Sequence, residues 1–208
     1  MARYTGPACK LCRKAAMKLF LKGQRCLTDK CSVERRAYAP GQQGTRHRKI
    51  SEYGIHLNEK QKVRHIYSVM ERQFRNYFKK AERKRGATGP ILLQLLERRF
   101  DNVVYRLGLA PSRPLARQLV NHNHFTVNGR KANIPSMILK VGDVIEVKEK
   151  SQKISAIQES LSSSIHKGIP SWLELQPDQF KGRVIQLPSR EDILLPIEEQ
   201  LIVEFYSR

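Results

Sequence analysis

Four cysteines near the start of the chain have the types and spacing of a metal site: Cys9, Cys12, Cys26 and Cys31. Two closely spaced pairs joined by a longer loop can wrap one tetrahedral ion, and four thiolates suit zinc. The same thiolates could hold an iron–sulfur cluster, and without a metal they could form disulfides, a redox pair or free thiols. Disulfides are disfavoured because no secretory signal is recognisable. We expect one zinc ion, whose binding stabilises a segment that buries little apolar surface.

A basic run follows a turn rich in proline and glycine, and it comprises Arg46, His47, Arg48 and Lys49. On a loop, these side chains can form an adaptable clamp for phosphate groups. The alternative is a charged segment that meets only solvent. The density of cations in the neighbouring sequence favours the phosphate clamp.

A second polar cluster accompanies a predicted helix from about Arg113 to His122. Arg113, Arg117 and Gln118 can share one side of that helix, and its first turn offers free N–H groups to phosphate. The cluster continues beyond the helix through His122, His124, Asn128, Arg130 and Lys131. We expect this surface to bind RNA, because we recognise no matching acidic residues around it. A polar surface without a ligand is the alternative.

The remaining candidate RNA contacts are basic side chains of the first 75 residues: Arg3, Arg13, Lys22, Arg35, Arg36, Lys60, Lys62, Arg64, Arg72 and Arg75. The chain carries 39 Lys and Arg against 19 Asp and Glu, a net charge of +20. Residues 1–50 hold 13 basic and 2 acidic side chains, whereas residues 151–208 hold 6 and 8. Charge of this density calls for a polyanionic partner, and its gradient predicts that the first two-thirds of the chain face nucleic acid.

An anionic membrane is the other polyanion to consider. No run of about 18 apolar residues occurs, and we find no signal peptide, so we expect a soluble, cytoplasmic protein with no membrane partner. Catalytic motifs are also missing: there is no nucleophile elbow, phosphate-binding loop or zinc-protease motif. Glu198 and Glu199 are chain neighbours that need not face the same way. The residues therefore predict a binding protein that is no enzyme and has no small-molecule substrate.

Several helices and a few short strands must position these side chains, which predicts an α+β fold. Apolar residues from Val63 to Ala81 recur at helical spacing, and further helices are expected over about 88–96, 100–107, 113–122 and 151–164. Strands are expected at 125–127 and 144–147, with a tight turn at Asn128-Gly129. The C-terminal end predicts short strands at 184–185, 194–195 and 201–203.

Six segments, spread from end to end of the chain, have distinctive sequences: 1–7, 39–42, 59–64, 71–76, 101–106 and 199–208. Together they resemble one known family, the bacterial small-subunit ribosomal protein four. The resemblance implies an N-terminal extension at 1–50 with a metal knuckle, and a helical domain starting at 51–97. It also implies an inserted alpha-L RNA-binding module at 98–162, and a segment at 163–208 that packs back on the helical domain. That module also occurs in some RNA-modifying enzymes and tRNA synthetases.

Members of this family are structural constituents of the small ribosomal subunit. The resemblance implies a primary binder of small-subunit ribosomal RNA that nucleates assembly, contacts small-subunit protein five and helps line the path along which messenger RNA enters. By position, Arg46, Arg48 and Lys49 match the basic loop near that path. The four cysteines match members with a zinc knuckle, while Gln43 departs from the histidine found in many relatives. An RNA-modifying enzyme or a free RNA-binding regulator that uses the same module is the alternative function.

Overall fold

The structure is a computed structural model that describes residues 3–42, 44–45 and 49–207, without the side chains of residues 164–167. The chain forms two compact units. The first comprises Met1–Leu92 and Leu195–Arg208, and the second comprises Leu93–Leu194. None of the helices in the described part of the chain has the length and apolar character that crossing a bilayer requires.

The first unit begins with short helical turns that carry the cysteines or lie next to them. They are α1 (Ala8–Lys14), the 3-10 turn η1 (Gly23–Leu27) and α2 (Ser32–Arg35). Leu19 and Leu21, between α1 and η1 in the sequence, are buried and supply apolar packing to this segment. The Arg13 guanidinium lies 4.8 Å from the Tyr38 ring centroid, and its Nε donates a hydrogen bond to the Tyr38 carbonyl oxygen at 2.9 Å. Apolar packing and this cation–π contact order the segment.

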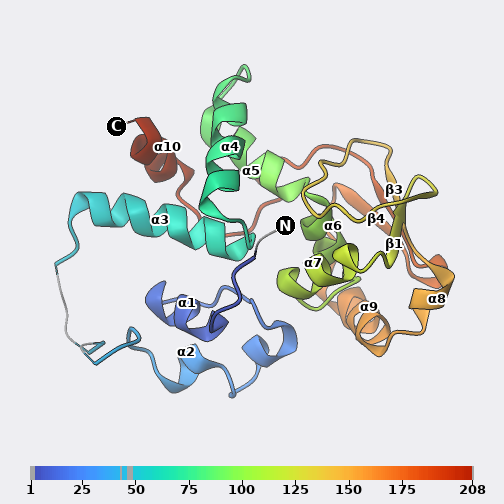
Figure 1. Cartoon of the computed structure of the whole chain (residues 1–208), viewed down its shortest axis with the longest axis horizontal. Coiled ribbons are helices and arrows are strands. Elements are labelled where there is room, and N and C mark those ends of the chain that lie inside the picture. Colours follow the sequence, from blue (N-terminus) through green and yellow to red (C-terminus); the bar gives the residue numbers. More distant parts are fainter. Residues whose placement is uncertain (1–2, 43, 46–48, 208) are drawn as a thin grey trace. The chain divides into compact units, whose positions relative to one another are not determined.

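Two longer helices, α3 (Glu52–Ile66) and α4 (Glu71–Glu82), follow (Figure 1). Ser51 caps α3, because its hydroxyl accepts a hydrogen bond from the Gly54 N–H at 3.3 Å. The apolar periodicity predicted one helix across this region, but the chain breaks between the two. Ser68 adopts a left-handed φ of 53°, and the Val69 N–H bonds the Arg64 carbonyl oxygen at 3.0 Å. This closure ends α3 and sets a new direction for α4.

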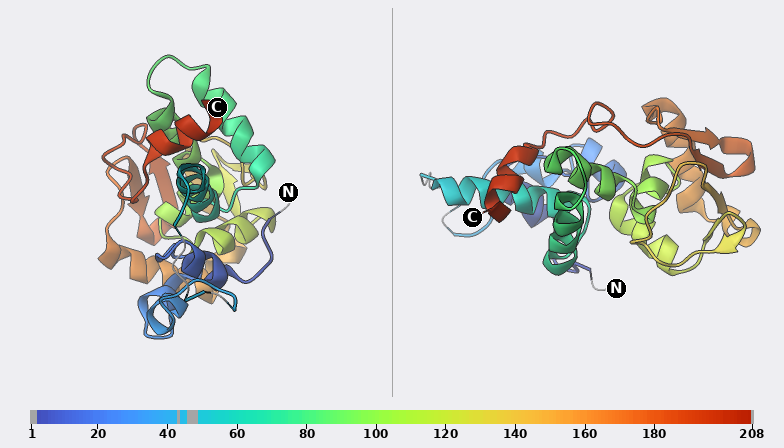
Figure 2. Two further views of the ribbon diagram at one scale, coloured as in Figure 1. Left: turned by 90° about the vertical axis from the view of Figure 1, so that its left-hand side faces the viewer. Right: turned by 90° about the horizontal axis from the view of Figure 1, so that it is seen from above.

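The C-terminal residues return to the first unit as α10 (Glu199–Ser207), and α5 (Thr88–Glu97) begins there. Figure 1 and both views of Figure 2 show α10 beside α3, although the two are far apart in sequence. The predicted strand at 201–203 is therefore wrong. Three apolar residues in a row suited a strand, but Ile202 is buried one turn before the aromatic pair Phe205-Tyr206, which is helical spacing.

The second unit combines helices with a five-stranded antiparallel sheet, which confirms the α+β class. Its helices are α6 (Phe100–Arg106), α7 (Arg113–Asn121), α8 (Glu149–Gln152) and α9 (Ser155–Lys167). Its strands are β1 (Phe125–Val127), β2 (Arg130–Lys131), β3 (Val144–Val147), β4 (Leu173–Gln176) and β5 (Lys181–Val184), with the 3-10 turn η2 (Pro177–Gln179) before β5. The order across the sheet is β2-β1-β3-β5-β4.

One apolar core joins the helices and the sheet of the second unit. Phe100 and Phe125 are fully buried and meet edge to face at 6.1 Å, and Trp172 is 1 % exposed. β5 passes close to the end of α6: a Cβ at Gly182 would lie 2.5 Å from Leu107 Cδ1, so any larger residue there would displace the buried Leu107 side chain. β4 and β5 come from the predicted C-terminal segment and complete the same sheet as β1 and β3. The domain boundaries inferred from the sequence stay a prediction.

Candidate nucleic-acid interface

The exposed side of α4 carries a row of cations, here called the α4 surface: Arg72, Arg75, Lys79, Lys80 and Arg83. The opposite side of the helix is buried through Phe74, Tyr77, Phe78 and Ala81. Spacings of three and four residues align Arg72, Arg75, Lys79 and Arg83, with Lys80 at the edge of this stripe, so several cations can reach one phosphate backbone together. The predicted RNA contacts include Arg72 and Arg75 but not the other three, although Lys79 and Arg83 recur at the same helical spacing.

The cations predicted on α3 differ from those on α4, because all three are engaged within the chain. Lys60 is 5 % exposed; its Nζ lies 2.9 Å from Glu71 Oε1 and 4.3 Å from the Phe205 ring centroid. Lys62 Nζ lies 2.6 Å from Glu59 Oε2 and donates a hydrogen bond to the Pro196 carbonyl oxygen. Arg64 Nη1 lies 3.4 Å from Glu71 Oε2. Through these ion pairs and hydrogen bonds, the three side chains hold the C-terminal segment and α4 against α3.

Glu71 is the centre of that network. Burial alone would raise the pKa of its carboxyl, but hydrogen bonds from Lys60 and Tyr206 outweigh burial and lower that pKa. The Tyr206 hydroxyl donates to Glu71 Oε1 at 2.9 Å, and burial together with this bond raises the pKa of the phenol. The carboxylate therefore stays ionised and ties three helices together.

The basic residues predicted in the first 50 positions lie mostly at the surface. Arg3, Lys22, Arg35, Arg36 and Lys49 are exposed, whereas Arg13 is half-buried against Tyr38. Arg46, His47 and Arg48, the core of the predicted phosphate clamp, lie outside the described residues. Their predicted role stays a prediction.

The predicted metal site is wrong. Cys9, Cys12, Cys26 and Cys31 line one small pocket, yet in the described part of the chain no group of three or more His, Cys, Asp or Glu side chains could hold a metal ion. All four are free cysteines, which was one of the alternatives. Burial raises the pKa of the Cys12 thiol. Neither zinc nor an iron–sulfur cluster fits, and the packing of Leu19 and Leu21 orders the segment instead.

The two arginines predicted as RNA contacts on α7 are buried in the second unit. Arg117 Nη1 lies 3.4 Å from Asp101 Oδ2, and that carboxylate also holds Arg99 Nη2 at 2.6 Å. Arg113 Nε donates a hydrogen bond to Asn102 Oδ1 at 2.7 Å. The expectation that no acidic residue matches the cations of this module is therefore wrong, because Asp101 pairs with two of them.

The exposed polar residues of the second unit lie at the end of α7 and on the hairpin that follows. Gln118, His122, Asn128, Arg130 and Lys131 are exposed, and Asn128-Gly129 forms the predicted tight turn with φ values of 50° and 74°. His124 is half-buried, with Nδ1 2.9 Å from Ser151 Oγ. Burial, with help from the nearby His122 and Lys148, lowers the pKa of His124. At neutral pH it can offer RNA hydrogen bonds but no charge.

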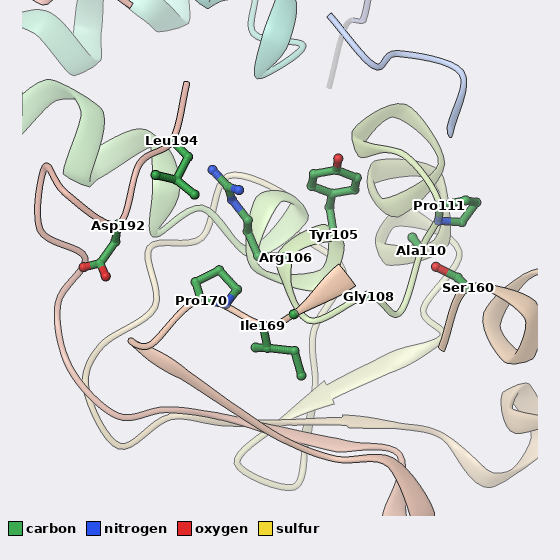
Figure 3. Close-up of a pocket in the computed structure, with 11 residues that line it drawn as sticks. Tyr105, Arg106, Gly108, Ala110, Pro111, Ser160, Ile169, Pro170, Asp192 and Leu194 are labelled. Carbon is green, nitrogen blue, oxygen red and sulfur yellow. The ribbon is translucent and has the colours of Figure 1, made fainter. Parts of the chain in front are cut away.

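A pocket of about 390 Å³ opens on the second unit. Its ionisable groups are held in structural contacts: Arg106 pairs with Glu97 at 2.7 Å, and Asp192 accepts hydrogen bonds from Ser171 and Ser189. Those bonds lower the pKa of Asp192. Figure 3 shows Asp192 and Ser160 at opposite sides of the pocket view, with the ring of Pro170 and the side chain of Ile169 between them. These labelled groups form no nucleophile–base pair.

Comparison with known proteins gives one consistent result. Residues 3–97 match the family model described as ribosomal protein S4/S9 N-terminal domain, and residues 98–145 match the S4 domain. The chain is 63 % identical to the small ribosomal subunit protein uS4 of Geobacter sulfurreducens and 64 % identical to that of Geobacter metallireducens. It is 61 % identical to the uS4 protein of Desulforapulum autotrophicum. Each match covers 100 % of both chains.

Proposed function

The chain belongs to the ribosomal protein S4 family, and on this premise we propose that it is a structural constituent of the small ribosomal subunit that binds the subunit's RNA. Proteins of this family are structural and not enzymes, so the pocket on the second unit needs no catalytic interpretation. The observation that carries the proposal is the α4 surface, a continuous face of five cations backed by a buried apolar face.

Exposed cations bind RNA by replacing the counterions condensed on its phosphates. In our proposal the α4 surface, the hairpin residues Arg130 and Lys131, and the exposed cations of the N-terminal segment make these contacts. Gln118, His122, His124 and Asn128 add hydrogen bonds. Lys60, Lys62, Arg64, Arg113 and Arg117 act indirectly, because their internal pairs hold the helices that present the exposed groups.

A finer role follows from the family resemblance. We propose that the chain binds small-subunit RNA early and nucleates assembly, that it contacts small-subunit protein five, and that it helps line the path along which messenger RNA enters. The excess of acidic over basic residues in positions 151–208 supports a protein-facing side, and the exposed Lys49 supports the messenger contact. We propose that the alpha-L RNA-binding module at 98–162 binds the RNA.

Co-sedimentation tests this function against a free regulator of RNA, the second candidate. The full chain should pellet with small ribosomal subunits and remain with them after a wash in high salt, because many contacts formed during assembly dissociate together only slowly. A free regulator would stay in the supernatant at the same salt. Recovery of most of the chain in the supernatant would contradict the proposal.

A further inference from the structure

Two polar loops of the second unit meet beside the β1–β2 hairpin. One is the turn Asn128-Gly129, and the other contains Lys140 and the pair Gly142-Asp143 just before β3. Asn128, Gly129 and Gly142 all have left-handed φ values, of 50°, 74° and 90°. Asparagine and glycine tolerate this conformation better than other residues, so both loops have the composition that their tight turns require.

Two hydrogen bonds of the Asn128 side chain join this turn to the second loop and the start of β3, and a third bond lies within the second loop. Asn128 Nδ2 donates to Asp143 Oδ1 at 2.9 Å, and the Lys140 N–H donates to the other oxygen, Oδ2, at 2.7 Å. Asn128 Oδ1 accepts from the Val144 N–H at 2.9 Å. One carboxylate oxygen of Asp143 therefore holds the Asn128 side chain of the neighbouring turn, and the other oxygen closes the Lys140 loop through the Lys140 backbone.

Three cations lie on or next to these two loops in the sequence. Arg130, Lys131 and Lys140 are exposed, and none of them makes an ion pair that we find within the described residues. Asp143 also interacts electrostatically with Arg98, whose Nε donates a hydrogen bond to the Leu139 carbonyl oxygen at 2.9 Å. A carboxylate on a surface that binds a polyanion weakens the electrostatic attraction to it. We therefore expect Asp143 to favour binding in another way.

We propose that Asp143 is a positioning residue for RNA binding: it fixes the Lys140 loop against the Asn128-Gly129 turn, so that Lys140 joins Arg130 and Lys131 as one phosphate-binding group. This inference rests on the proposed function. It adds Lys140 to the RNA contacts and assigns an acidic residue a favourable part in binding a polyanion. Preorganisation explains the gain, because loops already held in place lose less conformational entropy on binding.

The Asp143→Asn variant tests the inference, since charge and geometry predict opposite outcomes. It raises the net charge by one, so simple electrostatics predicts tighter binding to deproteinised small-subunit RNA. An amide has one acceptor oxygen and cannot accept from both Asn128 Nδ2 and the Lys140 N–H. We expect affinity to fall about fivefold, the effect of losing one hydrogen bond of ordinary strength. We also expect the salt dependence to become shallower by about 0.7–0.9 in log–log slope, as for one lost phosphate contact.

The double variant Asn128→Asp with Asp143→Asn supplies a rescue. The carboxylate introduced at position 128 can accept from the Val144 N–H and from the amide introduced at position 143. The oxygen of that amide can accept from the Lys140 N–H, so all three bonds return with the net charge of the original chain. Aspartate also tolerates the left-handed φ of position 128. Affinity and salt slope should return to those of the original chain. Asp178→Asn, an exposed acid on η2, makes the same charge change elsewhere and should not weaken binding.

Each outcome has one meaning. If Asp143→Asn binds RNA as tightly as the original chain or more tightly, the positioning role is wrong. It is also wrong if the exchanged pair restores the melting temperature but leaves affinity low, because the loss would then have another cause. The triple change of Arg130, Lys131 and Lys140 to alanine tests the underlying function separately. If that variant binds normally, the hairpin does not bind RNA; if it binds weakly while Asp143→Asn binds normally, only the positioning role fails.

Discussion

The buried carboxylate of Asp101 lies between the guanidinium groups of Arg99 and Arg117. Removing charges from water is costly, and only mutual pairing offsets that cost. Loss of the carboxylate would leave two cations buried without their counter-charge. These residues therefore bear on the stability of the second unit and not on direct contact with RNA.

Replacing Asp101 with asparagine should lower the free energy of unfolding by about 3–5 kcal/mol, the usual cost of breaking a buried ion pair from one side. Denaturant titration followed by circular dichroism measures it. Asp178→Asn is the matched control, since that aspartate is exposed, and it should change stability by less than about 0.5 kcal/mol. Equal stabilities for the two variants would show that the buried cluster contributes little.

His65 gives the stability a dependence on pH. Burial lowers its pKa to about 4, with smaller contributions from Arg64 and Lys14, whereas the unfolded value is 6.5. Between these values the unfolded chain binds a proton that the native chain does not, so stability should fall as pH falls from about 6.5 to 4. His124 acts in the same direction, because its pKa is also lowered.

The variant His65→Gln should flatten the decline in stability between about pH 6.5 and about pH 5, a range chosen to lie above the titration of Glu71. Thermal unfolding across this range measures the slope, and the exposed His122→Gln serves as the control. An unchanged slope in His65→Gln, or an equal change in both variants, would mean that His65 is not the group responsible.

At the scale of single residues, the sequence predicted which side chains are chemically notable but not which of them face outward. Arg117 and Arg130 look alike in sequence, yet one is paired inside the core and the other is exposed. Asp101 lies 16 positions from Arg117, and spacing along the chain does not reveal such a pair. The metal site predicted from the cysteines was wrong for a related reason: their spacing permits a metal site but does not determine how the side chains are arranged.

Among the helices and strands, α4 carries the clearest functional assignment. Changing Arg75, Lys79 and Arg83 to alanine removes three cations from one stripe of the α4 surface. We expect the log–log slope of RNA affinity against salt to become shallower by about 2–3, with affinity reduced by about one to two orders of magnitude. Filter binding at several salt concentrations measures both values.

The matched control changes three exposed cations of the second unit to which no RNA contact is assigned: Lys150, Lys153 and Arg183. It alters the net charge by the same amount and should reduce affinity far less. If both variants lose the same affinity, overall charge and not the α4 surface would govern binding.

Elements with strong periodicity or distinctive turns could be predicted from the sequence, whereas elements that depend on distant contacts could not. The apolar face of α4 and the Asn128-Gly129 turn appear as expected. The break at Ser68 was missed, because a serine carries no strong signal for a left-handed conformation. α10 was missed because the contacts of its aromatic residues are with distant parts of the chain: Phe205 contacts Lys60, and Tyr206 contacts Phe78. The sequence does not reveal such contacts.

For the whole molecule, one property links sequence to function. Basic residues outnumber acidic ones, so ion pairs within the chain cannot neutralise all of its positive charge. Ion pairs within the described residues involve only a minority of the 39 Lys and Arg. The positive charge in excess of the acidic residues repels itself, so the folded chain gains stability when a polyanion neutralises it. The family could be inferred from motifs spread along the chain, because a motif is identified by its residues alone and does not depend on a correct prediction of the fold.

Salt dependence of binding tests this account most directly. The purified full chain is titrated into deproteinised small-subunit RNA at a series of salt concentrations, and the logarithm of the affinity is plotted against the logarithm of the salt concentration. If exposed cations neutralise about six phosphates, the slope should be on the order of −5. A slope near zero would contradict the account, because binding would then release no counterions.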